Sequence, residues 1–193
     1  MICLTPQRYQ KRACAVFSKT RRAWGKLTNM HDDFPLLWAD KTILGGSEAL
    51  YHALRFTEHP ALQQYVLDAP TPMQSKTRAY EHLEKTRDDW LLGGNVQAMH
   101  WCLEQKTAQY FDTLLAVMLA SQDKPFVEYS SRDPFWGASK VAEGEIEGVN
   151  ALGQLWDRTR LRILGHALKH PDSPFEPMAL ALPEPFLLEH AIS

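Results

Sequence analysis

Apolar side chains recur at helical spacing in the middle of this chain. Between residues 95 and 120 they are separated by three, four or seven positions, at Val96, Met99, Leu103, Tyr110, Leu114 and Met118. A pattern of this length predicts one central amphipathic helix, because side chains at such spacings share a helix face. Its polar face is expected to carry Glu104, Lys106 and Gln109. The same spacing in 150–169 predicts a C-terminal helix that Gly165 weakens slightly.

A shorter helix is expected from Ser47 to Phe56. Serine can cap the free amides at a helix start, so the helix should begin close to Ser47. Its inward face then carries Leu50, Ala53 and Leu54. The opposite stripe carries Glu48, Tyr51 and Arg55. The pattern therefore places a carboxylate, a phenol and a guanidinium along one side of the helix.

Strands are expected to be few and short. The apolar runs at 14–18 and 126–129 are candidates, although each is too short for periodicity to separate a strand from a loop. Five prolines between Pro171 and Pro185 interrupt any regular element, so this segment should be extended, draped over the body or disordered. These patterns predict a predominantly helical α+β fold, with one compact domain over 1–170 and a proline-rich tail over 171–193.

Composition limits the class of protein. A chain of 193 residues that is 45% hydrophobic can bury one sizeable core, which favours a single domain over two. The three cysteines have no Cys-x-x-Cys spacing, so neither a zinc site nor a disulfide framework is indicated. The sequence contains no signal peptide and no apolar stretch of about 18 residues. We therefore expect a soluble, cytoplasmic protein without a membrane partner.

The net charge of −2 conceals a basic N-terminal region. The first 31 residues contain no acid, and they carry Arg8, Lys11, Arg12, Lys19, Arg21, Arg22 and Lys26. Positive charge at this density can follow a phosphate backbone, although it is also compatible with an ordinary solvated surface.

The region from Asp133 to Arg162 has the character of a ligand site. Its Trp-Gly pair offers a flat stacking face beside a position without a side chain, and its Gly-x-Asn-x-Leu-Gly run puts an amide and small residues at a helix start. A sugar, a base or a phosphate could dock there. The candidate binding residues are Trp136, Gly137, Asn150, Leu152 and Gly153. Trp136 could instead be a core aromatic.

Several further segments occur in an order typical of one family. They are Phe17-Ser18-Lys19, Trp24-Gly25-Lys26-Leu27-Thr28-Asn29-Met30, Phe34-Pro35-Leu36, the run Gly46–Phe56, Pro72-Met73-Gln74-Ser75-Lys76, Arg87-Asp88-Asp89-Trp90, the run Met99–Lys106 and Val127-Glu128. Together with the closing Gly-x-Asn-x-Leu-Gly run, the set resembles the NADAR (YbiA-like) superfamily of N-glycosidases across residues 17–160. Thr28 stands where the family usually has serine, and the hydroxyl is kept. The resemblance implies a single compact NADAR/YbiA-like domain.

The resemblance also implies hydrolysis of an N-glycosidic bond at the anomeric carbon of a ribose phosphate or ADP-ribose. One branch of the family removes ADP-ribose from guanine bases in nucleic acid, and the other acts on phosphoribosylamino-pyrimidine intermediates of riboflavin biosynthesis. Lys19, the Met-His-Trp-Cys-Leu run and the basic N-terminus favour the first branch, with single-stranded DNA as the expected partner. A ribosylated small molecule is the alternative substrate. A non-catalytic module that binds ADP-ribose or nucleotides is a further alternative.

Residue chemistry assigns roles within that reaction. The carboxylate of Glu48 would stabilise positive charge on the ribose ring, and Lys19 could attack as a neutral amine or serve only in binding. Asp133 is a candidate second acid, or a partner for ring hydroxyls. The expected substrate-binding residues of the first half of the chain are Gly25, Asn29, Ser47, Tyr51, Arg55 and Lys76. No cofactor and no metal are expected. The oligomeric state is left open.

Overall fold

The computed structural model describes residues 2–18, 20–38 and 40–179. The chain divides into two compact units, which are described one at a time. The first contains the chain up to Thr28 together with Phe111–Phe175, and the second is built on Asn29–Tyr110. Helices predominate and the strands are short, so the fold is α+β. The boundaries expected at residues 170 and 171 remain predictions.

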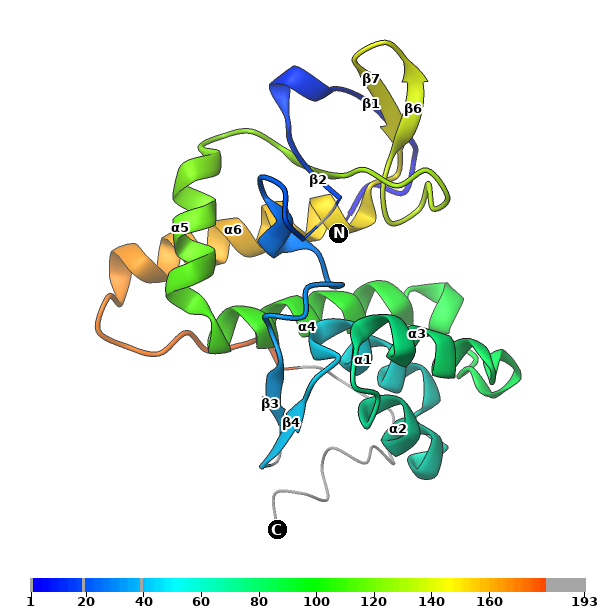
Figure 1. The fold of residues 1–193 in the computed structure, drawn as a ribbon. Coiled ribbons are helices and arrows are strands. Elements are labelled where there is room, and N and C mark those ends of the chain that lie inside the picture. The colour runs from blue at the N-terminus through cyan, green and yellow to red at the C-terminus, as the bar shows by residue number, and fades with distance from the viewer. Residues whose placement is uncertain (1, 19, 39, 180–193) are drawn as a thin grey trace. The chain divides into compact units, whose positions relative to one another are not determined.

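Short strands make up two small sheets in the first unit (Figure 1). The strands are β1 (Gln7–Gln10), β2 (Ala15–Phe17), β5 (Phe126–Glu128), β6 (Ser139–Ala142) and β7 (Glu145–Gly148). An antiparallel sheet has the order β1-β7-β6, and β2 pairs with β5 in parallel. The two strands expected from the apolar runs are therefore present, and they pair with each other. The polar strands β1, β6 and β7 lack the apolar alternation that would have predicted them.

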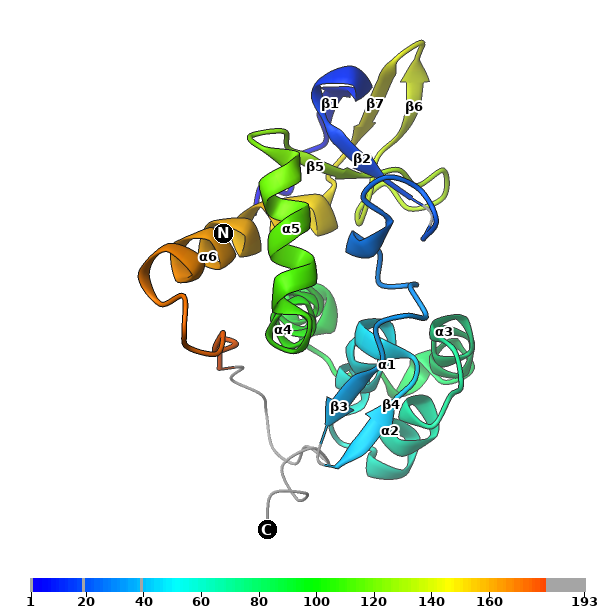
Figure 2. The ribbon, with the colours of Figure 1, turned by 60° about the vertical axis from the view of Figure 1, so that its left-hand side comes forward.

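Two helices complete the first unit, α5 (Phe111–Ser121) and α6 (Ala151–Lys169), and they pack against each other (Figure 2). The predicted C-terminal helix is thus found almost within its expected bounds. Strand β5 also packs on α6, and the indole Nε1 of the buried Trp156 donates to the carbonyl of Leu27 at 2.8 Å. Two short 3-10 turns, Lys11–Ala13 and Gly25–Leu27, lie in the N-terminal part of the unit.

The start of α6 is tied to β5 by one side chain. Asn150 has a φ of 54° and is 1% exposed, and its Nδ2 donates to the carbonyl of Phe126 at 2.9 Å. Its Oδ1 accepts from the backbone nitrogen of Glu128 at 3.0 Å. A Cβ on Gly153 would stand 2.1 Å from the same Phe126 carbonyl. The closing motif therefore contains the contacts that fasten a strand to a helix.

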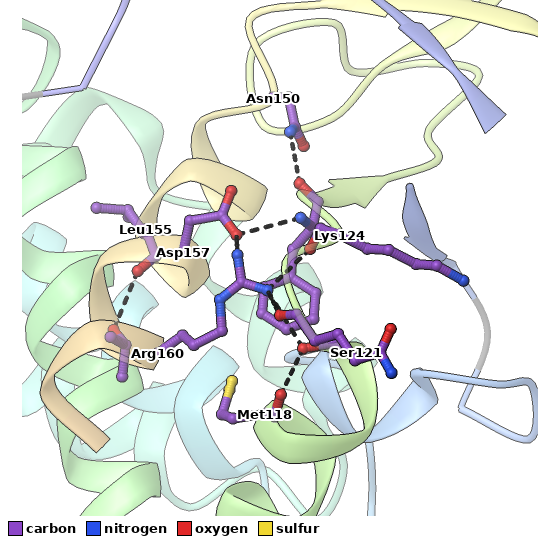
Figure 3. Close-up of polar contacts among 10 residues, drawn as sticks. Met118, Ser121, Lys124, Asn150, Leu155, Asp157 and Arg160 are labelled. Carbon is purple, nitrogen blue, oxygen red and sulfur yellow. Dashed lines mark hydrogen bonds and ion pairs between the residues drawn. The ribbon is translucent and has the colours of Figure 1, made fainter. Parts of the chain in front are cut away.

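Arg160 joins α6 to the end of α5 (Figure 3). Its Nη1 donates to the carbonyls of Gln122 and Lys124, at 2.9 Å and 2.8 Å, and to the Ser121 hydroxyl at 3.2 Å. Its Nη2 bonds to Asp157 at 2.6 Å. The guanidinium therefore pairs backbone carbonyls of the turn that follows α5 and fixes that turn against α6.

The second unit consists of a hairpin and four helices. The hairpin pairs β3 (Leu36–Trp38) with β4 (Lys41–Ile43), and the helices are α1 (Gly46–Ala53), α2 (Pro60–Leu67), α3 (Pro72–Tyr80) and α4 (Gly94–Gln109). Three 3-10 turns, Leu54–Phe56, Leu83–Lys85 and Trp90–Leu92, connect them. Helix α1 packs against α2, α3 and α4, and each of its residues is buried. It is the central element of this unit (Figure 1).

Helix α1 begins where it was expected, but Ser47 does not cap it. The N-cap is Gly45, without a side-chain hydrogen bond, and the Ser47 hydroxyl instead donates to Asn29 Oδ1 at 3.0 Å. Gly46 has a φ of 54°, and a Cβ there would stand 2.5 Å from the carbonyl of Phe34. Close approach of two backbones, rather than a hydroxyl cap, therefore sets the start of the helix.

The single helix expected over 95–120 is wrong. Helix α4 ends at Tyr110, which has φ −129° and ψ 37° and whose hydroxyl donates to the carbonyl of Pro35, and α5 begins at the next residue. The expected polar face is also wrong for Glu104 and Lys106, which are 0% and 1% exposed. Gln109 is exposed and bonds in both directions to the backbone of Leu37. Helix α4 is buried on most sides, so polarity does not mark a solvent face.

The described part of the proline-rich segment, residues 171–179, contains no helix or strand. Phe175 is buried there and stacks on Phe111 with a centroid distance of 5.6 Å. The remainder of the segment, from residue 180, lies outside the described residues.

We predict that Gly153→Ala lowers the free energy of unfolding by about 2 kcal/mol or more, because its Cβ would meet the Phe126 carbonyl at 2.1 Å. Gly165→Ala in the same helix is the matched control. A Cβ there meets nothing within 4 Å, so it should raise the free energy of unfolding by up to about 1 kcal/mol. Urea denaturation of both variants measures the difference, and equal effects would contradict the packing argument.

Arg160→Leu should destabilise the protein by roughly 2–3 kcal/mol, because it leaves the carbonyls of Gln122 and Lys124 without their donor. Arg158→Leu changes an exposed arginine of the same helix and should stay within about 0.5 kcal/mol of wild type. Thermal unfolding followed by circular dichroism compares them. A loss of similar size in both variants would show that the hydrogen bonds of Arg160 contribute nothing specific.

Candidate active site

A buried carboxylate lies at the beginning of α1. Glu48 is 8% exposed, and its Oε1 lies 3.1 Å from Nε2 of His52, which is 2% exposed. The two residues are four positions apart, so they stand one above the other on the same helix face. A charge so far from water needs partners, and the histidine is the first of them.

Cations complete the surroundings of this carboxylate. Burial raises the pKa of Glu48, but the hydrogen bond and charge of His52 and the charges of Lys76 and Arg55 outweigh it, so that the pKa is lowered overall. Glu48 is therefore ionised at neutral pH. It has the protonation state needed to stabilise a developing positive charge.

Aromatic rings lie among these cations. The guanidinium of Arg55 lies 5.2 Å from the ring centroid of Trp90 and 5.6 Å from that of Tyr80. Lys76 Nζ lies 5.4 Å from the Tyr80 centroid, and the rings of Tyr51 and Trp90 are 5.1 Å apart. Positive charges that alternate with ring faces suit a ligand that carries both phosphate and a flat base.

Arg87 extends this arrangement. Its Nη2 donates to Asp89 Oδ2 at 3.0 Å, and its Nε lies 2.7 Å from Asp89 Oδ1 in an ion pair. Its guanidinium lies 5.6 Å from the Trp90 centroid. Its backbone nitrogen donates to the carbonyl of Arg55 at 3.0 Å. The segment that carries Trp90 is thereby fixed against the end of α1. We call the set Glu48, Tyr51, His52, Arg55, Lys76, Tyr80, Arg87 and Trp90 the Glu48 cluster.

Asn29 and Ser47 lie in the same unit, and Ser47 directly precedes Glu48. Both are buried, and Ser47 donates to Asn29 Oδ1 while Asn29 Nδ2 lies 2.8 Å from the sulfur of Met99. Their contacts link the chain that precedes the hairpin to α1 and α4. This link holds the first turn of α1, which carries Glu48.

The second unit thus contains six of the candidate site residues, Asn29, Ser47, Glu48, Tyr51, Arg55 and Lys76. The first unit contains Gly25, Asp133, Trp136, Gly137, Asn150, Leu152 and Gly153. Lys19 lies outside the described residues. The roles that the sequence suggests for all of these residues remain predictions.

The candidates of the first unit have identifiable structural contacts. Asp133 Oδ1 accepts from the backbone nitrogens of Phe135 and Trp136, at 3.1 Å and 2.9 Å, which makes a tight turn. A Cβ on Gly137 would stand 2.7 Å from the carbonyl of Glu128. The side chain of Trp136 is partly exposed at this turn. The turn therefore fixes the backbone that carries the indole.

Gly25 and Leu152 are placed inside the first unit. Gly25 is buried in a 3-10 turn, where it donates to the carbonyl of Arg22 and accepts from Thr28. Leu152 is 3% exposed and belongs to the apolar core. Backbone geometry and packing account for both positions.

Sequence reasoning did not assign His52, Tyr80, Arg87 or Trp90 to the site. His52 could have been found from its spacing of one helical turn after Glu48. Arg87 and Trp90 stand in one of the family-like segments, where no chemical role had been attached to them. Tyr80 carries no sequence signal, because its place depends on how α3 packs against α1.

Within the described ranges, no group of three or more histidine, cysteine, aspartate or glutamate side chains could hold a metal ion. The helices of those ranges are also too short or too polar to cross a membrane.

Comparisons with known proteins agree with the motif order. The NADAR domain model matches residues 15–164. The NMR structure of the E. coli protein YbiA superposes with a TM-score of 0.67 at 24% sequence identity, over 80% of this chain and 87% of the YbiA chain. No curated protein matches the sequence significantly. The resemblance that the motifs indicated, and the α+β fold expected from it, are confirmed.

The buried Lys106 generates a prediction about pH. It is 1% exposed, its Nζ lies 4.3 Å from the Phe34 centroid, and burial lowers its pKa from 10.5 to about 7. Between these two values the unfolded chain binds the proton and the folded chain does not, so stability should rise with pH by about 1.4 kcal/mol per pH unit.

Lys106→Met should abolish this rise and should stabilise the protein at pH 7. Its advantage over wild type should shrink as the pH approaches 10. Lys85→Met changes an exposed lysine of the same unit and should keep the wild-type slope. Urea denaturation across pH 7–10 tests the assignment, and parallel curves for wild type and Lys106→Met would contradict it.

Proposed function

The chain belongs to the NADAR domain family, an N-glycosidase-type family, and we propose that it removes ADP-ribose from guanine bases in nucleic acid. The observation that carries the proposal is the buried, ionised Glu48 with Lys76 and Arg55 beside it. A carboxylate stabilises a ribose that is losing its base, and two cations suit the pyrophosphate of ADP-ribose.

The proposed reaction is a hydrolysis. The bond between the anomeric carbon and the guanine nitrogen breaks, and its electron pair leaves with the base. Positive charge then develops on the ribose ring, where the carboxylate of Glu48 stabilises it. Water adds its oxygen to the anomeric carbon, and its proton passes to the departing base. The products are ADP-ribose and the unmodified guanine.

Lys19 offers a second route to the same products. As a neutral amine it would bond to the anomeric carbon while the base leaves, and the ring-opened sugar would form a Schiff base with it. Water would then hydrolyse that bond and restore the amine. Lys19 is a binding residue in the one-step reaction and a nucleophile in this one, and Asp133 is proposed as a second acid or as a partner for ring hydroxyls.

The aromatic rings of the Glu48 cluster support the choice of ligand. Tyr80 is 51% exposed and lies against the side chains of Arg55 and Lys76. Its ring can stack on a base while the cations pair with phosphate. We assign Tyr51 and Trp90 to the wall of this subsite, and Trp136, Gly137, Asn150, Leu152, Gly153 and Gly25 remain proposed substrate contacts.

The basic N-terminal region supports nucleic acid as the carrier of the modification. Arg12, Arg21, Arg22 and Lys26 are exposed in the first unit, whereas Arg8 is paired with Glu147. Exposed cations without acidic neighbours in sequence can track a phosphate backbone. Single-stranded DNA is the proposed partner, because its bases are accessible without opening a duplex.

Glu48→Gln should lower the rate of ADP-ribose release from guanine-ADP-ribosylated single-stranded DNA by at least about a hundredfold, because the amide carries no negative charge. Affinity for free ADP-ribose should change little. Glu58→Gln, which alters an exposed carboxylate of the same unit, should keep wild-type activity. Chromatography of the released ADP-ribose measures the rates, and calorimetry measures binding.

The other outcomes separate the alternatives. Release of ribose 5-phosphate from phosphoribosylamino-pyrimidines, without release from DNA, would replace the proposal with clearance of riboflavin intermediates. Binding of ADP-ribose without turnover of either substrate would replace it with a non-catalytic binding module.

A further inference from the structure

His52 is the direct neighbour of the proposed catalytic carboxylate. Its Nε2 lies 3.1 Å from Glu48 Oε1, and both side chains are at least nine-tenths buried. Within the described residues its other ring nitrogen, Nδ1, is buried without a hydrogen-bond partner. The hydrogen bond to Glu48 therefore sets the orientation of the His52 ring.

The carboxylate determines which nitrogen carries the proton. An ionised Glu48 can only accept hydrogen bonds, so Nε2 of His52 must be the donor. The hydrogen bond to Glu48 therefore places a proton on Nε2 of His52.

The ring is also held from its edges. The ring of Tyr51 lies 5.0 Å from that of His52, and the ring of Tyr80 lies 5.7 Å away, both in edge contacts. Such contacts limit rotation of the imidazole, so the bond to Glu48 has little freedom to move.

We propose that His52 is a positioning residue of this active site, which holds Oε1 of Glu48 and leaves Oε2 for the anomeric carbon of the substrate. The inference rests on the proposed N-glycosidase function. Without the imidazole, the carboxylate could rotate and would lose one of the groups that keep it ionised.

Other charged and titratable groups surround this pair. They are Tyr51 and Arg55 after Glu48 on the same segment, Lys76 and Tyr80 on α3, and Cys102 on α4, whose thiol is coupled to Glu48. Helix α2 contributes the neutral Gln63, which donates to the carbonyl of Ala53. Lys76 and Arg55 would remain in a His52 variant, so part of the support for an ionised Glu48 would survive.

The kinetic test compares His52→Phe, which keeps a flat ring without a donor, with His52→Gln, which keeps a donor one turn after Glu48. In His52→Phe we expect kcat to fall about tenfold or more, with KM within about twofold of wild type. Loss of the hydrogen bond raises the pKa of Glu48, so the acidic limb of the kcat profile should move to higher pH. His52→Gln should recover most of both properties.

His59→Phe is the matched control, because His59 lies outside the Glu48 cluster and should leave kcat and its pH profile unchanged. Circular dichroism verifies that each variant is folded. A His52→Phe enzyme with wild-type kcat and pH profile would overturn the proposal, as would a loss that His52→Gln does not reverse.

A second measurement needs no turnover. Nitrogen-15 NMR of the imidazoles should show His52 protonated on Nε2, and carbon-13 titration should show a higher Glu48 pKa in His52→Phe than in wild type. The opposite tautomer, or an unchanged Glu48 pKa, would overturn the positioning role. If wild type hydrolyses none of the offered substrates, the proposed function fails, while NMR still decides whether His52 holds Glu48.

Discussion

The second unit depends on the need to keep one carboxylate charged where little water reaches it. A buried carboxylate is tolerated only with partners close by. Glu48 has His52 on its own helix, with Lys76 on α3 and Arg55 just after α1. These partners come from different segments, so the charge is satisfied only when the helices are packed. The packing of these helices therefore determines the protonation state of Glu48.

In the first unit, side chains form hydrogen bonds with backbone groups that have no partner within a helix or sheet. Strand β5 is only three residues long and follows an irregular turn, so the strand and the turn both have backbone groups that need partners. Asn150 and Arg160 supply those bonds from α6. A motif that reads as a ligand site can thus also be a fastening between a strand and a helix. The amide of Asn150 holds β5 to the start of α6 whether or not a ligand is bound.

The sequence predicts the elements whose periodicity is simple and whose ends are local. This group contains helix α6, the start of helix α1, and the paired strands β2 and β5. Helix α4 does not, because burial of Glu104 and Lys106 removes the contrast between an apolar and a polar face. The break at Tyr110 depends on a bond to Pro35, which is distant in sequence. The order of motifs predicts roles for Glu48, Arg55 and Lys76, which stay predictions, whereas the place of Tyr80 beside them follows only from packing.

The backbone contact at Gly46 has a consequence for changing the specificity of this protein. The carbonyl of Phe34 occupies the space where any side chain at position 46 would begin, and the positive φ there also disfavours every other residue. Laboratory evolution of this protein should therefore leave this glycine fixed and diversify exposed positions such as Tyr80. Variation would then change the walls of the site, while the carboxylate stays anchored to an invariant helix start.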